Sequence, residues 1–168
     1  MPLGGAPRAA AGAPATVSRV SPPGIAALAT CLAARTRPRG KALLSGALGL
    51  IRSGSASPME TRARLMFHRA GFPEPELNAV VRDAHGGWLL EGDLVWREQR
   101  VIGEYQGSDH GSIKRRSADA SRATSAERHG YRVIEIFAED VFGGARRRMC
   151  LARFARALHL DLTTLRIE

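Results

Sequence analysis

The stretch that decides the fold is residues 88–106, which read WLLEGDLVWREQRVIGEYQ. Two runs rich in β-favouring residues flank the polar tetrapeptide REQR at 97–100. A short polar turn between two such runs is typical of a β-hairpin. We therefore expect strands at 88–96 and 101–105, joined by the tetrapeptide.

The length of this turn fixes which residues face each other. If REQR is the whole loop, opposed positions have residue numbers that add up to 197, and Asp93 lies directly across from Glu104. Because side chains alternate between the two faces of a strand, Glu91 and Gln106 lie on the same face as this pair. The register thus makes two carboxylates cross-strand neighbours.

Opposed like charges destabilise a sheet, and two unit charges about 4 Å apart repel by about 4 kcal/mol at an effective dielectric near 20. A divalent cation would offset this repulsion, since Mg²⁺ prefers oxygen ligands and is commonly held by one or two carboxylates together with water and phosphate. Three alternatives stay open: the pair is splayed, the register is shifted by one residue, or Arg97 or Arg100 pairs with the carboxylates.

A helix is predicted upstream of the hairpin, at 57–70. Ser57 is a favourable N-cap, Pro58 suits the first helical position, and Glu60 completes the pattern of a capping box. Gly71 then provides a C-terminal stop. We place the start of the main domain near Ser57.

The remaining elements follow from periodicity and from turn residues. A strand at 77–82 precedes the turn DAHGG at 83–87, and the polar stretch 113–129 has helical length. A strand at 131–137 and an amphipathic helix at 145–158 complete the chain. This order predicts an α/β fold, a mixed β-sheet (an antiparallel meander plus a later strand) flanked by helices.

Residues 1–56 form a low-complexity basic segment that precedes the main domain at 57–168. Residues 1–24 are rich in Ala, Pro, Gly and Arg, whereas 25–34 and 41–52 each have the composition of a short helix. A transit peptide, a disordered leader and a mis-set start codon are the alternatives for residues 1–24.

The net charge of +9 comes mainly from the N-terminal third of the chain. Residues 1–59 carry seven Lys or Arg and no acid, while residues 60–168 carry 18 basic and 16 acidic residues. The high isoelectric point therefore does not by itself indicate nucleic-acid binding. Cys31 and Cys150 show neither disulfide-framework nor zinc-ligand spacing, and no apolar run reaches membrane-spanning length. We expect a cytoplasmic protein without a membrane partner.

Several short motifs occur together in one order along the chain. Ser57-x-x-Glu60 opens a helix, Gly92-Asp93-Leu94 lies on one strand, and Glu104-Tyr105-Gln106-Gly107 lies on the next with His110 close behind. Together they resemble the PD-(D/E)XK nuclease superfamily, and within it the small bacterial domains similar to very-short-patch-repair endonucleases. The resemblance covers about residues 57–158.

The resemblance implies a restriction-endonuclease-like core in the order α-β-β-β-α-β-α. It also implies that Asp93 and Glu104 hold a catalytic Mg²⁺ (or Mn²⁺), with Glu60 reaching toward it and no small-molecule cofactor. The activity that the resemblance implies is endonucleolytic hydrolysis of DNA phosphodiester bonds. The capping box accounts for Glu60 equally well, so its role stays open.

Gln106 departs from the superfamily pattern, which usually has a Lys two residues beyond the second acid. Glutamine supplies an amide but no charge, so it can orient water or phosphate only by hydrogen bonding. His110 would act as a supporting acid, base or phosphate contact. The alternative is a fold that is kept for nucleic-acid binding or regulation with weak or no catalysis.

A basic cluster near the start of the helix expected at 113–129 fits phosphate binding: Lys114, Arg115, Arg116 and Arg122. Partial pairing with Asp119 is the alternative. The arginines of the last helix, Arg146, Arg147, Arg148, Arg153 and Arg156, fit a solvated face. A chain that is part of a longer gene product is a further alternative. The sequence predicts no recognition code and no oligomeric state.

Overall fold

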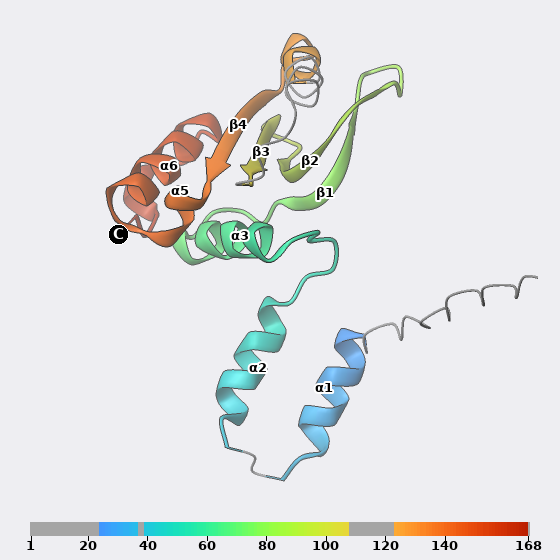
Figure 1. The fold of residues 1–168 in the computed structure, drawn as a ribbon, viewed down its shortest axis with the longest axis vertical. Helices are drawn as coiled ribbons and strands as arrows, with labels where there is room; N and C mark the ends of the chain where they lie inside the picture. The colour runs from blue at the N-terminus through green and yellow to red at the C-terminus, as the bar shows by residue number, and fades with distance from the viewer. Residues whose placement is uncertain (1–23, 37–38, 108–122, 168) are drawn as a thin grey trace, which may run out of the picture. The chain divides into compact units, whose positions relative to one another are not determined.

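The computed structural model describes residues 24–36, 39–107 and 123–167, and these belong to two compact units that divide between Ile51 and Arg52 (Figure 1). The N-terminal unit contains α1 (Ile25–Ala34) and α2 (Lys41–Leu50), and no residue of either helix is buried. Both helices were predicted, and α2 ends two residues before the expected end at 52.

The C-terminal unit contains a mixed sheet of four strands in the order β1-β2-β3-β4. The strands are β1 (Glu76–Arg82), β2 (Trp88–Trp96), β3 (Val101–Gln106) and β4 (Arg132–Phe137). β1, β2 and β3 form an antiparallel meander, and β4 runs parallel to β3. The mixed α/β architecture predicted from the sequence is confirmed.

The hairpin has the register that its turn predicts. Trp96 pairs with Val101, and Leu94 pairs with Gly103. Arg100 closes the turn with a φ of 54°, and its N–H donates to the carbonyl of Arg97 at 3.2 Å. The β2–β3 ladder ends at the Leu94–Gly103 pair, one step before Asp93 and Glu104.

The helix α3 (Pro58–Ala70) begins and ends where the capping residues predict. The hydroxyl of Ser57 accepts from the N–H of Glu60 at 3.1 Å, with Pro58 in the first turn. Gly71 ends the helix at a φ of 88°, a left-handed conformation that favours glycine.

Three elements follow β4: α5 (Ala138–Phe142), α6 (Gly144–Ala157) and the short 3₁₀ helix η1 (Leu162–Thr164). The sequence predicted α6 to within one residue at each end but missed α5 and η1. Residues 123–128 are helical, and the rest of the helix expected at 113–129 lies outside the described residues.

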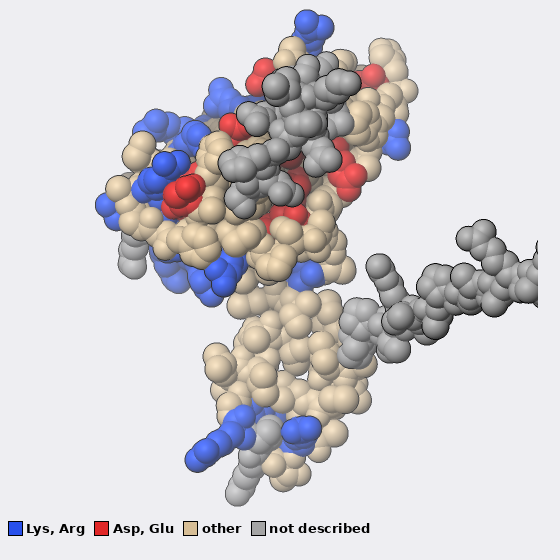
Figure 2. Space-filling view, viewed as in Figure 1, with Lys and Arg blue, Asp and Glu red and all other residues tan. Residues whose placement is uncertain are grey.

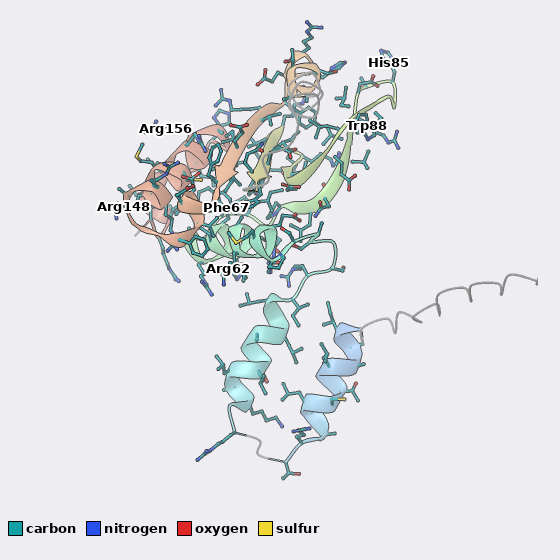
Figure 3. All side chains as sticks on the ribbon, viewed as in Figure 1. Arg62, Phe67, His85, Trp88, Arg148 and Arg156 are labelled. Atoms are coloured by element: carbon teal, nitrogen blue, oxygen red, sulfur yellow. The ribbon has the colours of Figure 1, made fainter. Side chains whose placement is uncertain are left out.

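The larger core lies between one face of the sheet and α3, α5 and α6 (Figure 1). Phe67 of α3 lies at its centre, with ring centroids 5.2 Å from Phe72 and Trp96 and 4.7 Å from Phe154 (Figure 3). These edge-to-face contacts join α3, β2 and α6 into one cluster.

A smaller core covers the opposite face of the sheet. Val95 of β2 and Ile102 of β3 pack there with Val81 and with Ala126 of the helical stretch 123–128. The sheet therefore has helical structure on both faces. Among the helices described, none combines the length and the apolar character needed to cross a bilayer.

Candidate functional site

An open cleft of about 1040 Å³ brings together three of the predicted site residues, Asp93, Glu104 and Gln106. These residues come from β2 and β3, and the other wall of the cleft includes residues of β4 and of the stretch 123–128. The hairpin thus delivers both acids of the predicted pair to one concave surface.

Strand alternation explains why the acids meet in the cleft. Val95 and Ile102 belong to the smaller core, and Asp93 and Glu104 each lie two residues farther from the hairpin turn on the same strands, hence on the same face. The site begins where the smaller core ends. Buried apolar side chains of the smaller core therefore lie next along the strands from the two carboxylates.

The side chain of Asp93 accepts a hydrogen bond from the backbone of β3 just beyond the point where the β2–β3 ladder ends. Its Oδ2 accepts from the backbone N–H of Tyr105 at 2.7 Å, just beyond the last paired residues of the hairpin. Burial raises the pKa of the Asp93 carboxyl; the Tyr105 hydrogen bond opposes this, and the charges of Glu60 and Glu91 raise it further. Asp93 is thus a half-buried acid in a field of other acids, a pattern common at functional sites.

Glu104 lies close to the backbone of β2 beside Asp93. A Cβ added at Gly92 would lie 2.7 Å from Cγ2 of Ile102 and 3.6 Å from Oε1 of Glu104. The absence of a side chain at Gly92 therefore lets β3 and the Glu104 carboxylate approach β2. Arg97, which the sequence left as a partner for the acids, pairs instead with Glu76, with Nη2 and Oε2 2.6 Å apart.

Glu60 of α3 serves as part of the helix cap and also lies near enough to Asp93 to affect it. Its Oε2 accepts from the N–H of Ala56 at 2.8 Å and from Nδ2 of Asn78 at 2.9 Å. Burial opposes ionisation of Glu60, but the hydrogen bonds from Asn78, Ala56 and Ser57 outweigh it and lower the pKa. Glu60 does not line the cleft that contains Asp93.

Asn78 is a site neighbour that sequence reasoning missed. It lies in β1 between the residues that pair with Gly92 and Leu94, and it has a φ of 44°. Its side chain donates to Glu60 and, at 2.6 Å, to the carbonyl of Gly54. Asparagine is depleted in strands and tolerates left-handed backbone, so its presence inside a predicted strand was the available signal.

Gln106 lies at the exposed end of β3, where its Nε2 donates to Oε1 of Glu135 at 3.3 Å. Glu135 belongs to β4, and its carbonyl accepts from Nη2 of Arg153 at 2.5 Å. The amide of Gln106 is therefore held toward β4 by a weak hydrogen bond that a water molecule or a phosphate could displace.

The lining of the cleft has an excess of acids. Five carboxylates line it, against two guanidinium groups: Glu91, Asp93, Glu104, Glu127 and Glu135 against Arg132 and Arg153. In Figure 2 acidic side chains gather in the middle of the C-terminal unit, and Lys and Arg lie mostly along its margin. Such a cleft attracts cations and repels phosphate unless a cation offsets the charge.

The two acids suit a hard divalent cation. Mg²⁺ typically takes one or two protein carboxylates, and Asp93 and Glu104 offer that number in one cleft. Within the described residues, no group of three or more His, Cys, Asp or Glu side chains is arranged to hold a metal ion. Any site here would therefore rely on water or on a substrate for its other ligands.

The remaining predicted site residues lie outside the described ranges: His110, Lys114, Arg115, Arg116 and Arg122. Comparison with models of protein families, with curated proteins and with solved structures gave no match.

Proposed function

We propose that residues 57–168 form a nuclease-like domain with a restriction-endonuclease-like core that hydrolyses DNA phosphodiester bonds with Mg²⁺ or Mn²⁺. The observation that supports the proposal most is the pair of acids in the cleft. Asp93 and Glu104 lie on neighbouring strands, on one face, beside the smaller core. The raised pKa of Asp93 means that its ionised form is held at a cost, which a bound cation would remove.

In this proposal a bound metal ion would supply the Lewis acidity that polarises the scissile phosphate and activates a water molecule for attack on phosphorus. Asp93 and Glu104 supply its protein ligands. The N–H of Tyr105 orients the Asp93 carboxylate through Oδ2. Glu60 is an auxiliary acid, because its hydrogen bonds from Asn78 and Ala56 hold it ionised near Asp93.

Gln106 would orient water or phosphate at the end of β3. Its amide already takes part in a hydrogen bond at 3.3 Å with Glu135, so it lies at the cleft and can exchange partners. In the proposal His110 supports proton transfer or phosphate contact, and Lys114, Arg115, Arg116 and Arg122 bind the backbone of DNA.

The absence of a lysine at residue 106 favours a second candidate, a nucleic-acid-binding or regulatory module without catalysis. In such a module the acids would bind a cation that bridges the cleft to phosphate, and no cleavage would follow. Both candidates predict DNA binding that depends on divalent cations, so only turnover separates them.

The test is cleavage of plasmid DNA by the purified full chain with Mg²⁺ or Mn²⁺. We expect nicking or linearisation that a chelator abolishes and that Asp93→Asn and Glu104→Gln each reduce at least 100-fold, since loss of a direct ligand exceeds the 10–100-fold typical of outer-shell partners. Glu98→Gln, in the exposed hairpin turn, is the matched control and should cleave like the wild type.

Cleavage that survives Asp93→Asn would point to a contaminating nuclease and contradict the proposed site. DNA binding by the wild type without cleavage, weakened by a chelator and by both variants, would favour the binding module. A contribution from Gln106 is tested by Gln106→Lys, which we expect to raise cleavage if the amide is a weak substitute for the usual cation.

A further inference from the structure

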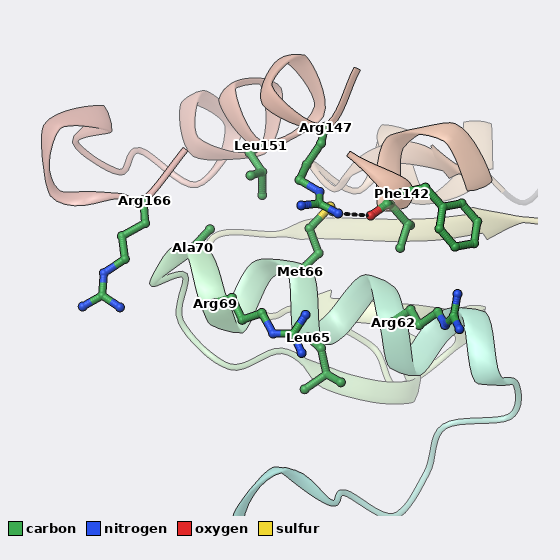
Figure 4. A pocket seen from close by; sticks show the side chains of 10 residues that line it. Arg62, Leu65, Met66, Arg69, Ala70, Phe142, Arg147, Leu151 and Arg166 are labelled. Atoms are coloured by element: carbon green, nitrogen blue, oxygen red, sulfur yellow. Dashed lines mark hydrogen bonds between the residues drawn. The ribbon is translucent and has the colours of Figure 1, made fainter. Parts of the chain in front are cut away.

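A second hollow, of about 640 Å³, lies between α3 and the α5–α6 region and shares no lining residue with the acidic cleft. Four arginines line it, and no acidic residue does: Arg62, Arg69, Arg147 and Arg166. Figure 4 shows that they come from α3, from α6 and from the segment after η1, with Arg166 and Arg62 toward opposite ends of the hollow. Residues far apart in the sequence thus bring positive charge to one place.

Within the part of the chain that the structure describes, none of the four guanidinium groups lies within 4.0 Å of a carboxylate. Grouped guanidinium groups repel one another and the hollow concentrates their field, so an anion bound there would offset the repulsion. This hollow therefore differs from the solvated arginine face that the sequence predicted for α6, to which Arg147 belongs.

Two of the arginines are fixed in place by the protein. Nη2 of Arg147 donates to the carbonyl of Val141 at 2.6 Å (Figure 4), and its buried Nε has no hydrogen-bond partner. The guanidinium carbon of Arg62 lies 5.3 Å from the ring centroid of Phe142. Preorganised guanidinium groups lose less side-chain entropy when they bind an anion.

The other two arginines are carried by anchored backbone. Arg69 is in the last turn of α3, and the N–H of Arg166 donates to the carbonyl of Ala70 at 3.0 Å, which holds the C-terminal segment to the end of that helix. The rest of the lining is mostly apolar and includes the ring of Phe142, which is 62% exposed. The hollow thus combines several fixed cations with an aromatic surface.

We propose that this hollow binds a nucleoside phosphate, either free or at a 5′-phosphorylated nucleic-acid end. The planar fork of arginine matches phosphate oxygens in pairs, and several arginines suit a group with more than one negative charge. The exposed ring of Phe142 provides a surface on which a base can stack. The inference does not depend on the proposed hydrolysis, since the two sites share no residue.

The test is isothermal titration of the full chain with ADP and with pyrophosphate at constant ionic strength. We expect both to bind, and Arg69→Ala and Arg166→Ala each to weaken binding about tenfold, as loss of a charge-assisted hydrogen bond does. Phe142→Ala should weaken ADP more than pyrophosphate, because it removes the stacking surface for the base as well as the ring that holds Arg62. Arg148→Ala is the control, because Arg148 is an exposed arginine of α6 outside the hollow (Figure 3).

No binding of either ligand would overturn the inference, as would an equal loss in Arg148→Ala, which would indicate a nonspecific charge effect. Asp93→Asn must leave binding unchanged. A loss of binding in this variant would indicate that the ligand binds in the cleft instead of the hollow. Competition against ADP by oligonucleotides with and without a 5′-phosphate separates the sources: only the phosphorylated strand should compete if the ligand is a nucleic-acid end, and neither should compete if it is a free nucleotide.

Discussion

The ionisation of Asp93 couples the stability of the fold to pH. Its pKa is raised mainly by burial, so in the metal-free protein the ionised form is a penalty that is complete above the raised pKa and absent below the ordinary value of 3.8. Asp93→Asn removes the charge but keeps an oxygen that can accept from Tyr105. We therefore predict that the variant is more stable than the wild type at pH 7 and that the difference disappears as the pH falls.

Urea unfolding between pH 3.5 and 8 in the presence of a chelator measures this difference. The lower limit of the series is just below the pH of about 4 at which an ordinary Asp is half protonated. A variant less stable than the wild type at pH 7 would contradict the proposed environment of Asp93.

Glu60 should show the opposite dependence. Hydrogen bonds lower its pKa, so it stabilises the fold above the ordinary value of 4.5 and loses that contribution as the pH falls through its lowered pKa. Glu60→Gln should therefore cost on the order of 1 kcal/mol of unfolding free energy at pH 7 and nothing in strong acid. A urea series extended into strong acid, below the lowered pKa of Glu60, measures it, and equal costs at both pH extremes would show that the charge of Glu60 is irrelevant to stability.

Gly92 allows the close approach of β2 and β3 at the site. A methyl group there would lie 2.7 Å from Cγ2 of Ile102 and 2.8 Å from Cγ2 of Val95, distances that the buried side chains must relieve by moving. We predict that Gly92→Ala lowers the unfolding free energy by about 1–3 kcal/mol, the usual cost of overpacking. Denaturant unfolding checks it, and a neutral result would mean that the strands are less tightly packed than described.

At the level of single residues, the sequence predicted the parts of the site that depend on strand register. A turn of fixed length and a period of two suffice to place Asp93 and Glu104 together. Asn78 could not be derived this way, because its contact with Glu60 needs a left-handed residue inside β1. The burial of Arg64 and its 2.8 Å ion pair with Glu74 were not predicted either, since periodicity alone does not identify a charged residue that is buried with a partner.

At the level of elements, α3 tests how far capping chemistry defines a helix. The hydroxyl of Ser57 satisfies the N–H of Glu60, which has no partner within the helix. We predict that Ser57→Ala costs about 1 kcal/mol, whereas Ser57→Asp is close to neutral because aspartate is an equally good N-cap. Thermal unfolding of the two variants makes the comparison, and an equal loss in both would assign the effect to something other than the cap.

The elements that the sequence predicted have local determinants, and those that it missed do not. The ends of α3 follow from Ser57, Pro58 and Gly71, whereas α5 has only five residues and is preceded by Phe137, which is no usual N-cap. Its start depends instead on Asp140, whose Oδ2 accepts from the N–H of Phe137 at 3.0 Å. A single acid inside a short segment is too weak a pattern to distinguish a helical turn from a loop.

At the level of the whole molecule, charge is separated between two hollows. The cleft at β2 and β3 has an excess of carboxylates, and the hollow between α3 and α6 has only arginines as its charged lining residues. The net charge of the chain obscures this separation, because most of the surplus lies before residue 60. Both proposals therefore depend on local fields rather than on the high isoelectric point.

The division of the chain at Ile51 and Arg52 leads to the last prediction. Both cores belong entirely to the C-terminal unit, and no residue of α1 or α2 is buried. Folding stability comes mainly from buried apolar surface. A fragment that begins at Arg52 should therefore fold, and its midpoint temperature of unfolding should lie within a few degrees of that of the full chain. This difference is less than the roughly 4–8 °C that 1 kcal/mol produces in a small domain. Calorimetry of the fragment and the full chain measures the two midpoints. A fragment that is unfolded, or that melts far below the full chain, would show that residues before Arg52 stabilise the C-terminal unit in a way that its cores do not reveal.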